Sequence, residues 1–526
     1  MNKGSKLIIL YVLFFPWFKA GLATGYGLLF FLGIAAIIAL FWFKDNFKYH
    51  LLNRYIIHTS FLLIILFSHL NPRFRNLTQQ DLIKLDYNNI LVNSGNINKS
   101  KSIADNLSLI IETGKVNKSE SLAIFFDFKN KYRDKYGNND EDIGFKFLSD
   151  CEKLISLDFI KFFPSVSIFD KKILTKHVFF IFHIYFFIFI SYYFQTRKLS
   201  KLLLFSIFIN TSLLALIGCF QKYFHQNTDQ YIEILGIWNA PEPRYYFSTF
   251  TYKNHWSCFA IVSLFIGIYI AYKTVIKSIT SLDRNPEFIL ILILNLLILS
   301  TIFLSGSRSG ILLCAIGLIS IIVIYFFNSG INFIKRIIYI ILISSLLVTL
   351  FTTYIIKSDQ AKEMKINSLS QFQNFRDGNF PLRFHLWKDA LTQIRDKPWL
   401  GSGFGAYAST GLQYQSSIVR DERNKVLENA HSNYIPLVAH AHNDVLEFLI
   451  EFGLFGCFLL FFPMFPPLSK IIFSKKTFSL AILLTGFSIV LLYHALDFPS
   501  RTPATLLSVS VLFAICYMTP SPSTKL

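Results

Sequence analysis

Long apolar runs alternate with polar segments along most of the chain. A helix needs about 20 apolar residues to cross the hydrocarbon core of a bilayer, and most of the runs approach that length. The pattern predicts an all-α polytopic membrane protein with about twelve transmembrane helices. The first run is short and is interrupted by Pro16. The twelve runs lie at about 7–18, 24–43, 51–70, 174–194, 202–220, 256–272, 287–304, 310–327, 337–356, 445–463, 478–496 and 504–518.

Composition excludes several other classes of protein. Only 16% of the 526 residues are charged, against about 25% in an average soluble domain. The 58 Phe are in clear excess, which argues against a disordered, collagen-like or disulfide-stapled chain. Five of the six Cys lie in or beside apolar runs, and no two form a C-x-x-C pair. We therefore interpret the cysteines as small apolar core residues.

The positive charges concentrate in one set of short loops. These loops hold 16 Lys and Arg against two acidic residues, Asp45 and Asp283. The positive-inside rule places them in the cytoplasm, and twelve spans then put both termini there. The formal net charge of +19 is accordingly a topology signal. We expect no nucleic-acid partner, because no motif supports one.

Two long polar segments divide the chain and fall on the opposite, non-cytoplasmic face. We expect N-terminal transmembrane helices over 1–70, a polar insertion of unknown role over 71–173 and a transmembrane core over 174–356. A loop over 357–443 and C-terminal transmembrane helices over 444–526 follow. A loop as long as 357–443 is uncommon unless it is functional, so we expect it to carry the chemistry.

The turn Ser305-Gly306-Ser307-Arg308-Ser309-Gly310 joins two predicted spans. An arginine near membrane depth usually has an anionic partner or faces a water-filled cavity. The small neighbours leave backbone N–H groups accessible, which suits a phosphate. The alternative is that Arg308 merely snorkels to the surface from a helix end.

The loop 357–443 contains a second candidate cluster. Arg383 and Trp387 are four residues apart, so they share a face if the segment is helical. Arginine suits bidentate phosphate binding, and an indole can stack on a sugar ring. Gly401 and Gly403, in Pro398-Trp399-Leu400-Gly401-Ser402-Gly403-Phe404-Gly405, permit close backbone approach. A plain glycine-rich turn after a short helix is the alternative.

A third cluster begins the tenth run, with His440 and His442 followed by Asn443. Asp444, Glu447 and Glu451 are spaced three and four apart, so their carboxylates line one helical face. Histidine is the natural general base near neutral pH. Two alternatives remain: Asn443 or Asp444 caps the helix, or the two histidines form a metal pair, for which a third ligand is lacking nearby.

Arg244, His255 and Arg501 form weaker candidates on the same predicted face, where helix-end packing is the alternative reading. Arg308, Arg383 and His442 all fall on the non-cytoplasmic side of a topology derived without them. Their agreement favours an enzyme that acts on an anionic, membrane-anchored substrate.

At these residues the sequence resembles the O-antigen ligase and polymerase superfamily of bacterial inner-membrane glycosyltransferases. The matching segments are S-G-S-R-S-G at 305–310, R-x-x-x-W at 383–387, P-W-L-G-S-G-F-G at 398–405 and A-H-N-D-V-L-E-F-L-I-E-F-G-L-F-G at 441–456, with weaker matches at 249–255 and 497–504. The resemblance covers roughly residues 240–505 and leaves the insertion 71–173 unexplained.

The resemblance implies a GT-C-like membrane fold with large periplasmic loops and an undecaprenyl-diphosphate-linked glycan donor, without metal, cofactor or nucleotide sugar. It also implies catalytic roles for Arg308 and Arg383 at the donor diphosphate and for His442 at the acceptor, as base or orienting group. We expect further substrate contacts from Trp387, Gly401, Gly403, His440, Asn443, Glu447, Glu451, Arg244, His255 and Arg501.

Among the activities of this superfamily we favour an O-antigen ligase with lipid A-core as acceptor. A polymerase that extends another lipid-linked glycan and a protein O-oligosaccharyltransferase are the alternatives. A transporter of lipid-linked saccharide is an alternative of another class. It would place functional charges near the bilayer midplane, whereas the candidate residues here lie on one face.

Overall fold

The computed structural model describes residues 3–22, 68, 164, 197–224, 232–235, 238–240, 245–277, 286–328, 382–407, 414, 416–419, 440–461 and 478–518. Outside these residues lie the predicted spans near 24–43, 51–70 (apart from Ser68), 174–194 and 337–356, the insertion 71–173 (apart from Pro164) and Arg244. The chain divides into two compact units. One comprises Met1–Asn53, Phe179–Gly378 and Met464–Leu526, and the other comprises Arg54–Val178 and Asn379–Pro463.

The first unit is a bundle of apolar helices. Its described elements are α1 (Lys3–Phe14), η1 (Phe15–Trp17), η2 (Lys19–Gly21), α10 (Arg197–Phe224), β1 (Ile232–Ile234), β2 (Trp238–Ala240), α11 (Lys253–Lys277), α12 (Pro286–Leu304), α13 (Arg308–Asn328), α21 (Phe478–Leu496), η7 (Pro499–Arg501) and α22 (Pro503–Met518). Within the described residues, α10, α11, α12, α13 and α21 are long and apolar enough to cross a membrane. Each contains one predicted run. The protein is therefore a multi-pass membrane protein, and the described part of the chain is mostly helical.

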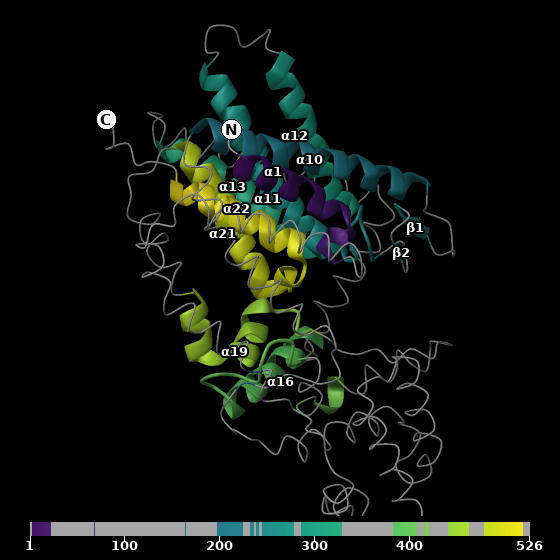
Figure 1. The fold of residues 1–526 in the computed structure, drawn as a ribbon, viewed down its shortest axis with the longest axis vertical. Helices are drawn as coiled ribbons and strands as arrows, with labels where there is room; N and C mark the ends of the chain where they lie inside the picture. The colour runs from purple at the N-terminus through teal and green to yellow at the C-terminus, as the bar shows by residue number, and fades with distance from the viewer. Residues whose placement is uncertain are drawn as a thin grey trace, which may run out of the picture. The chain divides into compact units, whose positions relative to one another are not determined.

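Helix α11 is the centre of this bundle and packs against α10, α12, α13, α21 and α22 (Figure 1). Glycines let two of these neighbours approach closely. A Cβ added at Gly317 of α13 or at Gly486 of α21 would lie 2.5 or 2.6 Å from the side chain of Phe265 on α11. Small residues at helix contacts are typical of membrane bundles, where close backbone approach supplies the packing energy.

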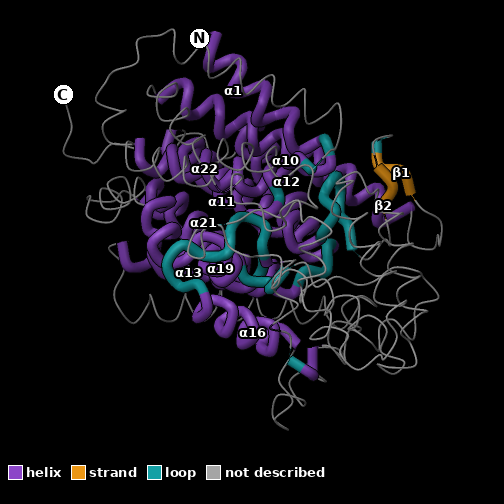
Figure 2. Tube along the Cα trace, turned by 60° about the horizontal axis from the view of Figure 1, so that its bottom comes forward, coloured by secondary structure: helices purple, strands orange, loops and turns teal. Residues whose placement is uncertain are grey.

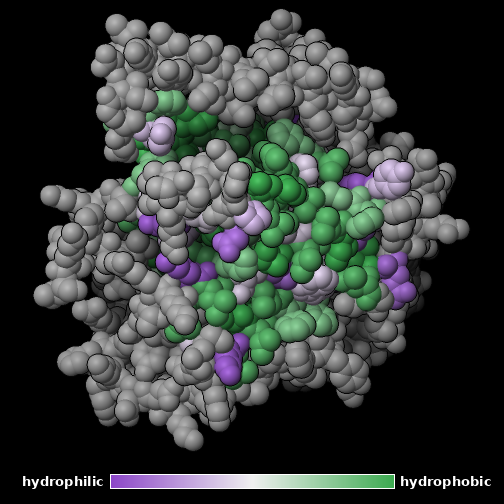
Figure 3. Space-filling view, turned by 90° about the horizontal axis from the view of Figure 1, so that it is seen from above, coloured by the Kyte–Doolittle hydropathy of each residue, from purple (hydrophilic) through white to green (hydrophobic). Residues whose placement is uncertain are grey.

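Helices α12 and α13 present apolar side chains outward. Ile293 and Leu296 of α12 and Leu312 of α13 are 56%, 64% and 59% exposed. In the view of Figure 3, apolar side chains make up most of the described surface. An outward face of this kind suits contact with lipid, so the two helices agree with the predicted spans 287–304 and 310–327.

A small hairpin departs from the predicted all-α fold. Strands β1 and β2 pair antiparallel, with Ile232 opposite Ala240 (Figure 2). Ile234, Trp238 and Tyr246 form a small core beneath it. The Lys19 ammonium lies 5.3 Å from the centre of the Trp238 ring. This cation–π contact joins the hairpin to η2, the short helix that contains Lys19.

The first predicted span ends where Pro16 interrupts it, because α1 stops at Phe14 and η1 follows. The Thr249 hydroxyl donates a hydrogen bond of 2.7 Å to the Pro16 carbonyl. This bond joins the turn after α1 to the segment before α11, at the end of the bundle where α12 stops and α13 begins. The turns that were predicted to lie on the non-cytoplasmic face thus gather at one end of the helix bundle. Which side of the membrane this end faces stays a prediction.

The second unit contains two described helices, α16 (Leu382–Asp396) and α19 (Asp444–Phe461), which pack against each other (Figure 1). Helix α19 occupies the predicted tenth span but is not continuous. It breaks at Gly453, where φ is 67° and ψ is 179°, a conformation that is essentially restricted to glycine. The apolar periodicity predicted the helix and could not reveal the break.

Candidate functional site

In the first unit, a group of hydroxyls holds the turn between α12 and α13. We call Ser257, Ser305, Ser307, Ser309 and Tyr493 the hydroxyl cluster. The oxygens of Ser257 and Ser305 are 2.9 Å apart, and those of Ser307 and Tyr493 are 3.0 Å apart. The Ser309 hydroxyl donates to the Tyr493 oxygen at 3.3 Å. These contacts fasten the turn to α11 on one side and to α21 on the other.

Arg308 is the first residue of α13 and extends from this rigid turn. The Ser307 hydroxyl accepts a hydrogen bond from the N–H of Gly310 at 3.2 Å, so Ser307 is the helix N-cap. The Arg308 side chain is exposed. A guanidinium beside the positive end of a helix dipole favours an anion, which agrees with the phosphate interpretation of this turn.

A second set of contacts joins the start of α11 to the segment after α21. The amide of Asn254 donates to the fully buried carboxylate of Asp497, which also accepts the N–H of Phe498 at 3.0 Å. The Nδ1 of His255 lies 2.5 Å from the Thr502 hydroxyl. Because His255 is only 4% exposed, this arrangement resembles the packing alternative more than a substrate contact.

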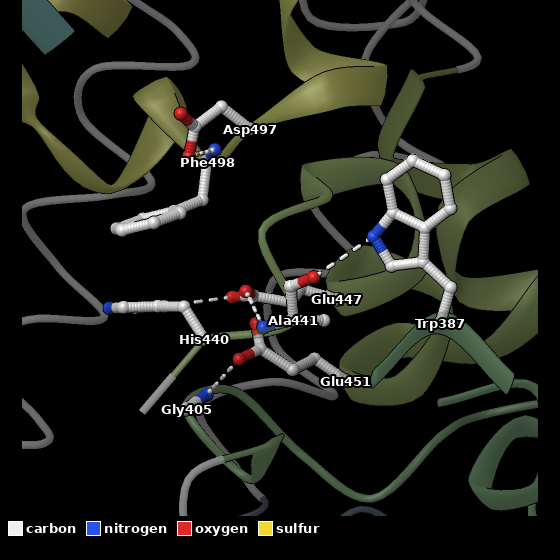
Figure 4. Close-up of polar contacts among 8 residues, drawn as sticks. All are labelled: Trp387, Gly405, His440, Ala441, Glu447, Glu451, Asp497 and Phe498. Carbon is white, nitrogen blue, oxygen red and sulfur yellow. Dashed lines mark hydrogen bonds and ion pairs between the residues drawn. The ribbon is translucent and has the colours of Figure 1, made fainter. Parts of the chain in front are cut away.

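In the second unit, the peptide of Ala441 is held on both sides (Figure 4). Its N–H donates to Oε1 of Glu447 at 2.7 Å, and its carbonyl accepts the indole N–H of Trp387 at 3.0 Å. We call these three residues the Ala441 frame. Trp387 is therefore hydrogen-bonded to the chain before His442. Stacking of its indole on a sugar ring stays a prediction.

His442 follows this frame in an uncommon backbone conformation. Its φ is +53°, in the left-handed region, which costs a non-glycine residue about 1–2 kcal/mol. The next residue, Asn443, caps α19 by accepting the N–H of Leu446 on its Oδ1 at 3.1 Å. The capping interpretation of Asn443 is thus confirmed. A strained residue held by bonded neighbours on both sides is typical of functional sites.

His440 pairs with the same glutamate that holds Ala441. Its Nδ1 is 3.1 Å from Oε2 of Glu447, and the His440 side chain is 33% exposed while the Glu447 side chain is 1% exposed. Glu447 therefore uses both oxygens on the segment 440–441. This pairing of an accessible imidazole with a buried carboxylate is an arrangement that supports acid–base chemistry.

The other acidic residues of α19 are buried on the predicted common face. Asp444 is 0% and Glu451 is 1% exposed. Oε1 of Glu451 accepts the N–H of Gly405 at 2.8 Å. Burial raises the pKa of Tyr407, and the nearby carboxylates of Glu447 and Asp389 raise it further, so Tyr407 stays a neutral phenol beside them.

The glycine-rich segment 398–405 fits into the break of α19. Ser402 N donates to the Ile450 carbonyl at 2.7 Å, and Leu454 N donates to the Pro398 carbonyl at 2.7 Å. Backbone groups freed by a helix break must find partners, especially at membrane depth. The segment supplies them, so Gly401 is needed first of all for backbone approach, which agrees with the structural alternative for this segment.

We expect Gly453→Ala to destabilise the protein by about 3 kcal/mol, from the disallowed backbone conformation together with overpacking. An added Cβ would lie 2.3 Å from the carbonyl group of Trp399. Thermal unfolding of the purified protein in detergent measures the loss. Leu454→Ala, at an exposed neighbouring position, is the control and should change the midpoint little. An unchanged midpoint in Gly453→Ala would contradict the break.

Residues 293–461 match the O-antigen ligase family. These residues form an O-antigen ligase domain. The match covers less than half of the 526 residues and includes the turn of Arg308 and the segments of Arg383 and His442. A comparison with curated proteins found no match.

The O-antigen ligase domain contains most of the predicted site residues. Arg308 belongs to the part of the domain in the first unit, and the other members belong to the second unit. Convergence of Arg308 with Arg383 and His442 therefore stays a prediction. The predicted site residues in the second unit are Arg383, Trp387, Gly401, Gly403, His440, His442, Asn443, Glu447 and Glu451.

Arg383 lies in the first turn of α16 and is half-buried, one turn before Trp387. The segment is helical, which is the condition under which their four-residue spacing puts the two residues on one face. His255 and Arg501 lie outside the O-antigen ligase domain, near the contacts of Asp497. Their roles in substrate binding, like those of Gly403 and Glu451, stay predictions.

Sequence reasoning missed the partners that position these residues. Ser257 and Tyr493 carry no motif of their own, and Tyr493 lies 186 residues from Ser307. The only available signal was the polarity of a hydroxyl inside an apolar run. Within the ranges given above, no three His, Cys, Asp or Glu side chains lie close enough together to hold a metal ion.

Proposed function

We propose that this protein is an inverting glycosyltransferase of the bacterial inner membrane, with both termini in the cytoplasm. It moves a glycan from undecaprenyl diphosphate to an acceptor hydroxyl at the periplasmic face. We favour O-antigen ligase activity with lipid A-core as the acceptor. The observation that carries the proposal is that one O-antigen ligase domain contains Arg308, Arg383 and His442, all predicted to face the periplasm.

The chemistry requires charge stabilisation more than it requires acid catalysis. The acceptor oxygen attacks the anomeric carbon while the bond from that carbon to the diphosphate oxygen breaks. Diphosphate leaves with the electron pair and needs cations rather than a proton. Arg308 and Arg383 supply this electrostatic contribution, which is typically about 3 kcal/mol for a well-placed donor.

Two structural features support the role of Arg308 at the diphosphate and the role of His442 at the acceptor. Arg308 extends from a turn that the hydroxyl cluster holds in place, so the backbone that carries the guanidinium is ordered before the substrate binds. His442 is held between the Ala441 frame and the Asn443 cap. Preorganised groups of this kind are effective because ordering them adds nothing to the barrier.

The proposal predicts product formation by the purified protein in detergent, without a membrane gradient. The substrates are an undecaprenyl-diphosphate-linked O-antigen and lipid A-core, and the product is read as glycosylated lipid A-core on a gel. Failure of the purified protein to make any glycan-containing product would contradict transferase activity and would favour a transporter.

The glycan products of a strain that lacks this protein identify the acceptor. Polymer that is still made but remains unattached to lipid A-core indicates a ligase. A single attached repeat indicates a polymerase. Loss of glycan from proteins alone, with lipopolysaccharide unchanged, indicates a protein O-oligosaccharyltransferase.

A further inference from the structure

We propose that His440 is the general base of the transfer, that Glu447 is the positioning residue that orients it, and that His442 orients the acceptor. This inference rests on the proposed function. The resemblance implied that His442 is either the base or the orienting group and that His440 is a substrate contact; the proposal moves the role of base to His440 and keeps His442 as the orienting group.

The hydrogen bond between His440 and Glu447 determines which ring nitrogen can take a proton. A carboxylate only accepts hydrogen bonds, so Nδ1 of His440, at 3.1 Å from Oε2, carries the hydrogen. The lone pair is then on Nε2. Figure 4 shows Nε2 on the side of the ring that points away from Glu447. Since one third of the side chain is exposed, an acceptor hydroxyl can reach this region.

Glu447 is itself held firmly, which makes it a reliable support. Its backbone N–H donates to the Asn443 carbonyl at 3.0 Å, within the first turns of α19. Its Oε1 accepts the Ala441 N–H at 2.7 Å, and its side chain is almost fully buried. The carboxylate therefore cannot rotate without breaking the Ala441 frame, and the His440 ring is oriented relative to α19.

The same pair can hold the charge that the reaction generates. The acceptor O–H bond breaks and its proton moves to Nε2 of His440 as the oxygen forms its bond to the anomeric carbon. The diphosphate departs with the electrons of the broken glycosidic bond. The imidazolium that results lies beside the Glu447 carboxylate, which stabilises it until the proton passes to water.

The decisive variant is His440→Asn. The asparagine amide nitrogen can replace Nδ1 as the donor to Glu447, while no proton-accepting nitrogen replaces Nε2. We expect kcat to fall about 10²- to 10⁴-fold, with the KM for donor and the melting temperature unchanged. His385→Asn is the matched control, because His385 lies on α16 of the same unit and is also half-buried. It should keep the wild-type rate.

The assay uses the full-length protein in detergent, with undecaprenyl-diphosphate-linked O-antigen and lipid A-core as substrates. Wild-type kcat in His440→Asn would overturn the base assignment while leaving the transferase in place. Absence of product from the wild-type protein would overturn both proposals.

Should His440→Asn melt at a lower temperature, rescue experiments decide. Added imidazole should restore transfer in His440→Ala, because a free base can then occupy the space of the missing ring, and should not restore it in His442→Ala. The reverse pattern, or no rescue of folded His440→Ala, would overturn the inference.

Discussion

Replacing Arg308 by alanine is expected to lower the rate of glycan transfer about 10²- to 10³-fold, the loss typical of one preorganised charge-stabilising donor. The fold should be unaffected, because the side chain is exposed and Ser307 caps α13 without it. The measurement is a single-turnover rate with the lipid-linked donor in excess of its dissociation constant, together with the melting temperature.

Two further variants sharpen this prediction. Arg308→Lys keeps the charge but loses the planar fork that matches a phosphate, so its rate should fall between those of the wild type and the alanine variant. Arg395→Ala removes an exposed arginine from the last turn of α16 and should leave the rate unchanged. If Arg395→Ala lowered the transfer rate as much as Arg308→Ala, the loss would reflect the net charge of the protein and would contradict a specific role for Arg308.

The position of Arg308 across the membrane is a separate requirement. A topology reporter fused after residue 308 should report the periplasm. A cytoplasmic location of the reporter would exclude Arg308 from a periplasmic site, whatever the transfer rate of the Arg308 variants.

Arg383→Ala and His442→Ala should each abolish surface glycan while the protein remains in the membrane. Wild-type levels of glycan in either variant would remove that residue from the mechanism.

Glu447→Gln is expected to lower kcat about 10³- to 10⁴-fold, as loss of the orienting carboxylate does in a carboxylate–histidine pair. The glutamine oxygen can still accept the Ala441 N–H, so the Ala441 frame survives. Its NH₂ group then faces Nδ1 of His440, which must become an acceptor. The ring hydrogen moves to Nε2, and the base becomes a donor.

The readout separates this effect from a loss of stability. The KM for donor and the melting temperature of Glu447→Gln should stay near wild-type values while kcat falls. Asp389→Asn is the matched control, since its carboxylate also accepts a backbone N–H, that of Ser416, at 2.9 Å. Burial raises the pKa of Asp389, so the charged form is disfavoured in the fold and a neutral amide should be tolerated. Wild-type kcat in Glu447→Gln would contradict the positioning role.

The features that the sequence predicted well are those set by neighbouring residues. In the part of the chain that the structure describes, five apolar runs are helices that can span a membrane. The spacing of Asp444, Glu447 and Glu451 correctly placed three carboxylates on one buried face. Helical period, capping and hydropathy act over a few residues, so they can be read from a single stretch of sequence.

The candidate site was predictable only in part. Arg383 and Trp387 were paired by spacing, yet the indole of Trp387 bonds to the carbonyl of Ala441, 54 residues away. Two glycines, Gly401 and Gly453, were noted in separate motifs, and their close approach to each other's backbone segments carries no local signal. Both contacts depend on how α16, α19 and the loop between them pack.

The sequence by itself determined that the chain crosses a membrane many times and which polar residues stand apart from the apolar runs, because transfer into lipid depends on composition over one span. Only the tertiary structure decided that His440 pairs with Glu447 and that Tyr493 supports the turn of Arg308. Such pairings arise when packed helices leave polar groups that must be satisfied inside the protein, and that requirement links residues without regard to their distance along the chain.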